Sequence, residues 1–334
     1  MNAQVTSAVR VLCVINRQSR DGAATGGWAQ LASVLSAAEV NYQVVEISRQ
    51  GLAEAIAHSL RIEPANAIIG IGGDGTHLAV LNALKQVERQ WPSLALPPYI
   101  AAPFGTGNNV AKSLGLEPGR RSLDTVLSVL YQGSDRRLDL GSWENSYFAD
   151  ALSIGLDPQI LTCRQELQDR LPAELKRVGQ GYLGYFFAGL MAIQRQTEWQ
   201  CEIVLDGMPW YTGRFTCLVL NNTRVYGGIF DPTPNARDDD GRLDIWRDIG
   251  LRGYLGGCIF NQRAQPGWVR RLGRRRMSAM GLAEASFRDC RIILEPPAPV
   301  QVDGEFQGVR QEVRLSAVPA TVTVRTPVAA STGP

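Results

Sequence analysis

Several features that would point directly to a function are scarce in this sequence. Only two histidines occur among its 334 residues, His58 and His77, so chemistry that depends on several imidazoles is nearly excluded. The six cysteines are scattered and form no C-x-x-C pair, which argues against a zinc site or a disulfide framework. Free thiols are typical of a reducing compartment, and we expect the protein in the cytoplasm.

Long hydrophobic runs and an excess of charge of one sign are missing as well. The longest apolar stretch, Tyr182–Ile193, is far shorter than the roughly 20 residues of a membrane-spanning helix. No N-terminal stretch has the composition of a signal peptide. With 34 basic and 32 acidic residues the net charge is +2, and nucleic-acid binding is a poor interpretation. We therefore expect a soluble protein, long enough for two domains with cores of their own.

The first third of the chain alternates between strand-like and helical patterns. Short apolar runs rich in β-branched residues predict strands at 11–15, 42–47, 67–71 and 99–102. Apolar residues at helical spacing between them predict helices at 28–38, 52–60 and 77–87. This order predicts an α/β domain over residues 1–134 with a doubly wound, mostly parallel sheet. Ligands of such sheets bind beyond the carboxyl ends of the strands.

From residue 135 to 307 the pattern changes to short strand-like runs, interrupted by helical stretches. The runs lie at 147–154, 202–205, 215–220, 243–247, 290–294 and 300–302, and the helical stretches at 173–196 and 251–257. This pattern predicts a β-sandwich-like second domain. Two further strand-like runs follow within 308–326, where Pro319 is expected to break them apart, and residues 327–334 form a predicted disordered tail.

Two glycine-rich turns, Gly72–Thr76 and Gly105–Asn109, follow strands of the first domain. Glycines let the backbone approach a ligand and present N–H groups to oxygens, and the start of a helix favours phosphate. Thr76 is the predicted cap of the helix after the first turn. In the second turn, Thr106 and Asn108 add a hydroxyl and an amide that can bind phosphate or ribose without adding charge. Together the turns predict a two-sided phosphate cradle.

Asp74 is the only acid in these turns, and it would repel a bare phosphate. It suits a site where Mg²⁺ lies between carboxylate and phosphate, although a tight turn whose Asp bonds its own backbone is an alternative. No G-x-x-x-x-G-K-[ST] motif occurs, which excludes a P-loop NTPase. Gly70–Gly75 also satisfies G-x-G-x-x-G, but Gln90–Pro98 lacks the acid that a dinucleotide site requires.

Two acidic turns lie in the second half of the chain. Asp238–Asp244 is interpreted either as a charged surface turn or as a structural cation site that uses Asp239 and Asp240. In Gln301–Glu305 a strand-like run delivers Asp303 into a turn, and in isolation its Asp-Gly pair predicts a hairpin.

Taken in order, these stretches resemble the diacylglycerol kinase catalytic-domain superfamily, which includes bacterial diacylglycerol kinases, sphingosine kinases and, more distantly, NAD kinases. The similarity covers nearly the whole chain. It rests on an ordered set of motifs: Asn16–Gly22, Gly72–Thr76, Pro103–Asn108, Asp139–Gly141, Ser153–Asp157, Asn221-Asn222, Gly227-Gly228, Asp239–Asp244 and Asp303–Glu305. In the first of these, Arg17 stands where the family has Pro.

The resemblance implies an ATP-binding domain, to which residues 308–326 return, and a lipid-binding domain over 135–307. It implies Mg²⁺-dependent transfer of the γ-phosphoryl group of ATP to a lipid hydroxyl, with diacylglycerol as the first candidate. Asp303 would be the base, with Asp74 as the Mg–ATP carboxylate or as a rival base, and Asp239 and Asp240 would bind a structural Mg²⁺. The implied nucleotide site comprises Asn16, Gly72, Gly73, Asp74, Gly75, Thr76, Gly105, Thr106, Asn108 and Glu305.

Two positions depart from the family pattern. Ala79 stands where the family commonly has Glu, and Asn109 stands where it commonly has Asp. Each change removes a carboxylate near the nucleotide, so a non-catalytic module that binds lipid or nucleotide is one alternative. A kinase of sphingoid bases or other lipids is a second. An NAD kinase is a third, although the Asn-Glu and Leu-Gly-Phe-Leu elements of that family are missing.

Two segments bear on how a lipid would be reached. Tyr182–Ile193 is expected to be a buried core helix, with a lining role in a lipid pocket as an alternative. Trp268–Arg276 is basic with an aromatic residue at its edge, and it is either a solvated helix face or a segment attracted to an anionic membrane. We expect peripheral contact with a membrane surface, and a homodimer is left open.

Overall fold

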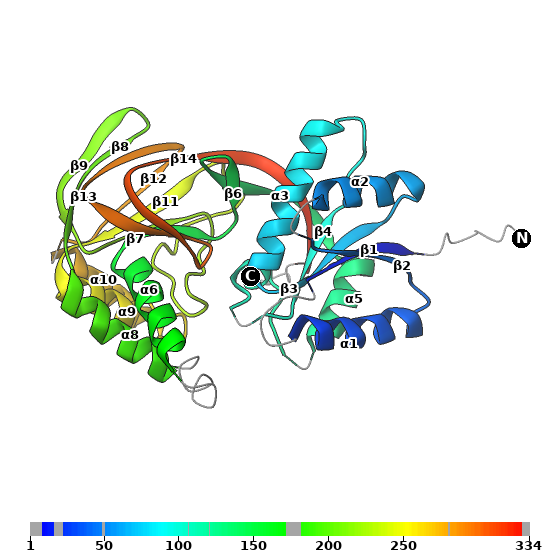
Figure 1. Cartoon of the computed structure of the whole chain (residues 1–334), viewed down its shortest axis with the longest axis horizontal. Helices are drawn as coiled ribbons and strands as arrows, with labels where there is room; N and C mark the ends of the chain where they lie inside the picture. The colour runs from blue at the N-terminus through cyan, green and yellow to red at the C-terminus, as the bar shows by residue number, and fades with distance from the viewer. Residues whose placement is uncertain are drawn as a thin grey trace, which may run out of the picture. The chain divides into compact units, whose positions relative to one another are not determined.

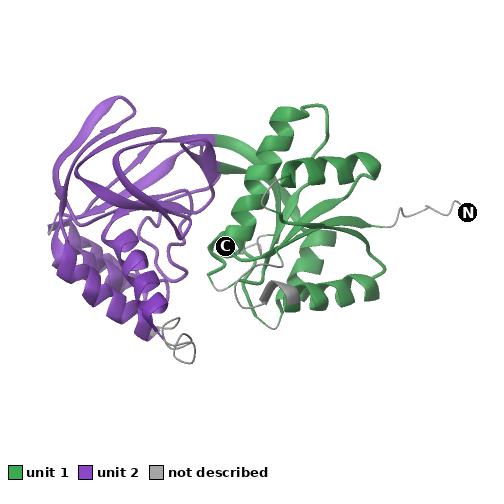
Figure 2. Ribbon diagram, in the orientation of Figure 1, with its two compact units in different colours: residues 1–139, 319–334 green, residues 140–318 purple. Residues whose placement is uncertain are grey.

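The computed structural model describes residues 9–16, 23–48, 51–105, 107–119, 121–171, 182–279 and 281–328. The chain forms two compact units, one of residues 1–139 with 319–334 and one of residues 140–318 (Figure 2). The strands β5 (Ser134–Trp143) and β14 (Glu305–Thr326) each run from one unit into the other. None of the described helices is long and apolar enough to cross a bilayer.

The sheet of the first unit is parallel, as the alternating sequence pattern predicts. Its strands are β1 (Arg10–Ile15), β2 (Asn41–Glu46), β3 (Ala67–Gly72) and β4 (Tyr99–Pro103), in the order β4-β3-β1-β2. The end of β14 adds a strand beside β4, with Val324 opposite Tyr99. Strands β1 and β3 are almost wholly buried, as expected for parallel strands that are covered on both faces.

Helices cover both faces of this sheet (Figure 1). The helices α2 (Leu52–Ile62) and α3 (Asp74–Gln90) pack together, and so do α1 (Ala23–Ala37) and α5 (Ser122–Gln132). A fifth, short helix, α4 (Asn109–Ser113), follows β4. The doubly wound arrangement is therefore confirmed for this unit.

The second unit contains one connected antiparallel sheet. Its strands include β6 (Ser146–Phe148), β7 (Ala151–Gly155), β8 (Trp199–Leu205), β9 (Met208–Phe215), β10 (Cys217–Asn221), β11 (Leu243–Asp248), β12 (Ala283–Phe287) and β13 (Asp289–Val302). The path runs β12-β11-β10-β7-β13-β14, and the β8–β9 hairpin joins at β13. The prediction of a β-sandwich is not confirmed, because a layer of helices packs on this sheet.

That layer consists of α6 (Leu156–Arg170), α8 (Tyr182–Arg195), α9 (Gly250–Phe260) and α10 (Gly267–Ala279), which gather on one side of the strands (Figure 1). The apolar core of the unit combines side chains from strands and from helices, and it includes Phe148, Phe215 and Ala188. The predicted helix over 173–196 is confirmed from residue 182 onward, and its first part lies outside the described residues. Helix α6 was not predicted from the sequence, although Pro158 in its first turn is typical of a helix start.

Two local predictions about chain breaks and buried helices are wrong. Pro319 does not interrupt the chain's last strand, because β14 continues through it while its partners change from β13 to strands of the first unit. The helix α8 is not simply a core helix either. It buries the small residues Ala188 and Ala192, whereas Phe186 and Phe187 are exposed.

Candidate functional site

The two glycine-rich turns lie against each other at the carboxyl edge of the parallel sheet. Strands β3 and β4 are neighbours, with Gly72 opposite Pro103, so both turns begin at the same level. A Cβ atom on Gly105 would overlap the Cα atom of Gly73, and one on Gly73 would lie 3.0 Å from the Cα atom of Gly105. Contact between backbones at this distance requires glycine on both sides.

Asp74 is the first residue of α3, and its carboxylate faces the second turn. Its Oδ1 atom accepts a hydrogen bond of 3.1 Å from the backbone N–H of Val110, at the start of α4. Gly107 makes room for this carboxylate, since a Cβ atom there would lie 2.6 Å from Oδ2. Burial raises the pKa of Asp74, and hydrogen bonds from Val110 and Asn109 and the charge of Lys112 oppose that rise. The carboxylate thus joins the two turns.

The side chain of Asn108 stabilises the second turn through hydrogen bonds to the turn's own backbone. It is buried and adopts a left-handed conformation with φ of 55°. Its Oδ1 accepts the N–H of Gly105 at 2.7 Å, and its Nδ2 donates to the carbonyl of Gly105 at 2.6 Å. Both polar atoms of the side chain therefore hold the loop, which leaves backbone groups as the natural contacts for a ligand.

Thr76 does not cap α3, contrary to the prediction. The helix begins at Asp74 with Gly73 as its N-cap, and Thr76 is a buried residue of the first turn. Its side chain packs on Gly72, where a Cβ atom would overlap it. At Gly75, in contrast, a Cβ atom would meet nothing within 4 Å.

Of two further residues in the predicted nucleotide site, the structure describes only Asn16. Asn16 directly follows β1 and is half-buried. Thr106 lies outside the described residues, and so does the part of the Asn16–Gly22 motif that covers 17–22.

A buried histidine–tyrosine pair beneath the first turn was missed by the sequence analysis. The Nδ1 atom of His77 lies 2.6 Å from the hydroxyl oxygen of Tyr99 on β4, and both side chains are fully buried. Desolvation lowers the pKa of His77 to about 4, so the imidazole is neutral at pH 7. The hydroxyl of Tyr99 occupies space that a Cβ atom on Gly70 would take. The only signal in the sequence is the isolated histidine on an apolar helix face.

In the second unit, Asp303 lies in the two-residue turn between β13 and β14, so the hairpin predicted from Asp303-Gly304 is confirmed. Asp303 and Gly304 both have positive φ, 46° and 84°. The Asp303 carboxylate accepts three backbone hydrogen bonds of 2.9–3.0 Å, from Ala149, Asp150 and Ala151. It is buried, whereas Glu305 at the start of β14 is exposed.

A chain of polar side chains leads from this turn into the helix layer. Gln301 accepts the N–H of Gly304 at 2.6 Å, and its Nε2 lies 3.3 Å from the hydroxyl of Tyr226. Tyr226 donates to the carboxylate of Asp157 on α6 at 2.6 Å, and Tyr254 on α9 donates to the same carboxylate. Burial, with the nearby Asp157 charge, raises the pKa of both tyrosines, which keeps them protonated donors. These residues fix the turn that carries Asp303.

In the acidic loop at 238–244 only Asp239 and Asp240 are exposed, and both carboxylates have protein partners. Asp239 forms an ion pair with Arg237 at 2.9 Å, and Asp240 accepts the backbone N–H of Arg242 at 3.0 Å. Burial and the charge of Asp240 raise the pKa of Asp244 to about 6. Within the described ranges, no three His, Cys, Asp or Glu side chains are grouped as ligands of a metal ion. The structural Mg²⁺ site therefore stays a prediction.

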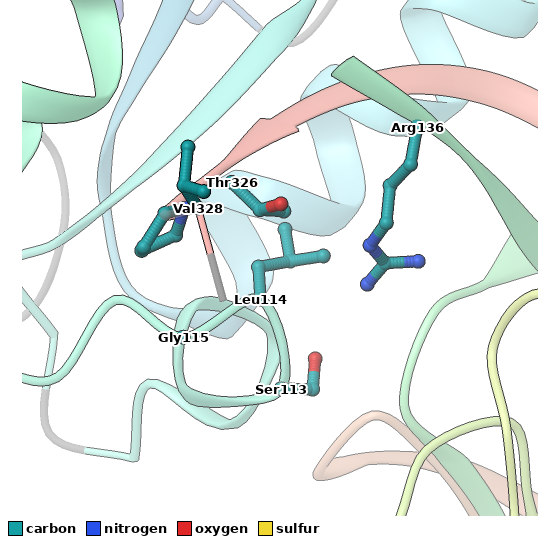
Figure 3. A pocket seen from close by; sticks show the side chains of 7 residues that line it. Ser113, Leu114, Gly115, Arg136, Thr326 and Val328 are labelled. Carbon is teal, nitrogen blue, oxygen red and sulfur yellow. The ribbon is translucent and has the colours of Figure 1, made fainter. Parts of the chain in front are cut away.

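A shallow cavity of about 380 Å³ lies beside α4 in the first unit (Figure 3). It is lined by Ser113, Leu114, Gly115, Arg136, Thr326, Pro327 and Val328. No residue of the first glycine-rich turn lines it. It lies at the carboxyl end of α4, whereas the Asp74 carboxylate binds the amino end of that helix.

Comparison with known proteins shows what this chain resembles. Residues 10–143, which include both glycine-rich turns, match the family model of the diacylglycerol kinase catalytic domain. The resemblance to the diacylglycerol kinase superfamily is confirmed. A diacylglycerol kinase of Bacillus subtilis is 28% identical over 58% of this chain and 59% of its own length. The chain thus aligns with about three-fifths of this relative.

Two further comparisons extend over more of the chain. A Stenotrophomonas maltophilia protein named "Probable lipid kinase YegS-like" is 26% identical over 83% of this chain and 82% of its own length. The crystal structure of a diacylglycerol kinase from Bacillus anthracis superposes on 97% of this chain and 99% of its own, with a TM-score of 0.66 and 20% identity. The fold of diacylglycerol kinases therefore extends through both units.

Proposed function

We propose that this protein is an ATP-dependent lipid kinase that transfers the γ-phosphoryl group of ATP to a lipid hydroxyl, with diacylglycerol as the first substrate to test. The observation that carries the proposal is the pair of glycine-rich turns packed backbone to backbone at the carboxyl edge of the parallel sheet. The diacylglycerol kinase domain match covers the same residues. Such an edge, with free N–H groups at the start of α3, suits the phosphates of a nucleotide.

In this proposal the backbone around Gly72–Thr76 and Gly105 binds the phosphates, and Asp74 holds Mg²⁺. The residues fit this ion in one respect: Mg²⁺ with ATP needs only one or two protein carboxylates, because phosphates and water supply the other ligands. Asp74 is the one carboxylate of the turns, and its amide hydrogen bonds hold it in place. Bound Mg²⁺ would neutralise charge on the phosphoryl group during transfer.

Asp303 is proposed as the base that accepts the proton of the lipid hydroxyl, and Asp74 is the rival candidate. Three backbone N–H groups stabilise the ionised form of Asp303 and fix its orientation. This gives a carboxylate that is held in one orientation as a proton acceptor. Glu305, exposed two residues later, is proposed to help bind nucleotide or metal. Asp239 and Asp240 keep their proposed role in a structural Mg²⁺ site.

The test is phosphoryl transfer from radiolabelled ATP in the presence of Mg²⁺, with a panel of hydroxylated lipids in mixed micelles and NAD as a control acceptor. A labelled lipid would support the proposal and name the substrate class, including a sphingoid base if that is the acceptor. Labelled NADP would replace it with an NAD kinase. Measurable ATP binding without product from any acceptor would contradict it and favour a non-catalytic module, and Ala79→Glu would then be the first restoration to examine.

A kinase whose substrate is dissolved in membranes has to work at their surface. We therefore propose peripheral membrane association in the cytoplasm, with a place in phospholipid metabolism.

A further inference from the structure

We propose that the outer surface of helices α9 and α10 binds an anionic phospholipid bilayer. The inference rests on the proposed function for its biological reason, because a lipid kinase meets its substrate in a membrane. Its physical basis is independent and lies in how these two helices expose their side chains.

The helices α9 and α10 form one firmly packed pair. Gly273 on α10 lies so close to Phe260 on α9 that a Cβ atom would overlap the ring, and Gly256 on α9 faces Met277 on α10. Gly257 in turn packs directly on Trp246 of the sheet. Close contact through glycines holds the outer faces of the two helices next to each other.

The outer face of this pair is both apolar and basic. On α10, Trp268 is 64% exposed and Leu272 is 48% exposed, and on α9 Leu255 and Ile259 are 46% and 54% exposed. Arg271 and Arg275 are exposed on the same face of α10, since residues 268, 271, 272 and 275 follow helical spacing. A helix with this composition is typical of those that lie in a membrane interface.

The arginines of α10 divide into paired and unpaired ones. Arg270 forms an ion pair with the buried Asp231 at 2.9 Å, and Arg274 pairs with Glu284. Arg271 and Arg275 pair with no acidic side chain in the part of the chain that the structure describes. From residue 249 to 283 the sequence contains no Asp or Glu, so the outward charge is not balanced locally. The partner must therefore supply negative charge.

Of the possible partners, an anionic bilayer matches both properties of the surface. Phosphate headgroups would pair with Arg271 and Arg275, and the layer beneath them would accept Trp268 and Leu272. A nucleic acid offers phosphates but no hydrocarbon for the apolar side chains. A second copy of this surface would bring like charges together. Helix α8 belongs to the same helix layer (Figure 1). It exposes further apolar side chains, among them Phe186 and Phe187.

The experiment is co-sedimentation of the full chain, without ATP, with phosphatidylcholine vesicles that contain or lack phosphatidylglycerol. We expect binding to the anionic vesicles only, and its loss in about 1 M NaCl, where the Debye length is about 3 Å. Arg271→Gln with Arg275→Gln should weaken binding roughly 25-fold, since each basic residue near a membrane contributes about fivefold. Trp268→Ser with Leu272→Ser should weaken it as well.

The control is Arg214→Gln with Arg314→Gln, which removes two exposed arginines, each paired with a glutamate, from β9 and β14 and should leave binding unchanged. Arg271→Lys with Arg275→Lys keeps the charge and should retain binding. Equal binding by the glutamine variant and the wild type, or stronger binding to duplex DNA than to anionic vesicles, would overturn the proposal. Vesicle binding needs no catalysis, so this outcome is distinguishable from failure of the kinase assay.

Discussion

At the residue scale, the glycines of the two turns serve different purposes. Gly105 and Gly73 are glycines because the two backbones touch, which is a requirement of the fold itself. Gly75 has open space around the position of a Cβ atom, and its φ is not positive. Nothing within the described structure requires glycine there, so the close approach of a ligand is the remaining physical reason.

Gly105→Ala should therefore lower the free energy of unfolding by about 1–3 kcal/mol, as overpacking does. Gly75→Ala should raise it by up to about 1 kcal/mol, because alanine favours the helix in which residue 75 lies. The second variant should nevertheless bind ATP at least tenfold more weakly. Chemical denaturation and calorimetric ATP titration measure these effects. Unchanged ATP affinity in Gly75→Ala would contradict a phosphate site at this turn.

His77 makes stability depend on pH in a predictable direction. Its pKa is lowered from 6.5 to about 4 in the folded protein by desolvation, so the unfolded chain binds the proton first. Stability from this residue is complete above pH 6.5 and is lost as pH falls toward 4, by about 3 kcal/mol. Urea unfolding at several pH values should show a shallower decline in His77→Gln. His58→Gln, at an exposed position, should decline like the wild type.

At the element scale, the β13–β14 turn is held by a carboxylate rather than by its own backbone alone. Asp303 accepts three N–H groups from residues 149–151, which connect β6 to β7 and begin β7, and Gln301 accepts a fourth from Gly304. The turn and the segment before β7 are thus one hydrogen-bonded element, although about 150 residues separate them in the sequence.

Asp303→Asn should abolish phosphoryl transfer and also lower the free energy of unfolding by about 1.5–3 kcal/mol, because the amide N–H₂ would face a backbone donor. ATP binding should persist, since Asp303 lies outside the glycine-rich turns. Kinase assays beside denaturation curves measure both effects. Glu305→Gln, at an exposed position, is the control for stability and should unfold like the wild type. A fully active Asp303→Asn protein would rule out the proposed base.

The proposed structural Mg²⁺ site in the acidic loop at 238–244 can be tested separately. If Asp239 and Asp240 hold Mg²⁺, the ion should raise the melting temperature of the wild type, and Asp239→Asn with Asp240→Asn should remove that rise. Without the ion, burial and the charge of Asp240 raise the pKa of Asp244 from 3.8 to about 6. The stability that protonated Asp244 contributes is therefore complete below pH 3.8 and is lost as the pH rises through about 6. Thermal melts with and without Mg²⁺ measure the melting temperature of the wild type and of the double variant. No response to Mg²⁺ in the wild type would exclude the structural site.

At the scale of the whole molecule, the first unit is built from both ends of the chain. The last part of β14 pairs with β4 and buries Val322 and Val324 in the first unit. Arg325 pairs with Asp135, and the Asp139 carboxylate accepts the N–H of Ala320. Residues 319–328 are therefore part of the proposed nucleotide-binding unit and not a tail of the second unit.

Truncation after Val318 should destabilise the first unit by about 3–6 kcal/mol, from the loss of two buried valines. Truncation after Val328 is the matched control and should leave stability unchanged. Limited proteolysis and thermal unfolding report on the unit directly. Equal resistance of the two truncated proteins would show that the returning strand is dispensable.

The sequence by itself determined the features that depend on short stretches of chain. Alternating apolar periodicities specify the parallel sheet of the first unit, and clustered glycines specify where its turns lie. The ordered motifs were sufficient to indicate the family. These features are readable because propensity, turn chemistry and motif spacing act over a few residues.

Only the tertiary structure decided which polar groups meet. Thr76 has the composition of a cap, yet Gly73 takes that position and Thr76 packs on Gly72. Asp74 reaches Val110, 36 residues away, and Asp303 reaches Ala149, 154 residues away. The arginines of α10 look alike in the sequence, but packing pairs Arg270 with the buried Asp231 and Arg274 with Glu284, and turns others outward. Such pairings depend on how distant elements pack, which local patterns do not encode.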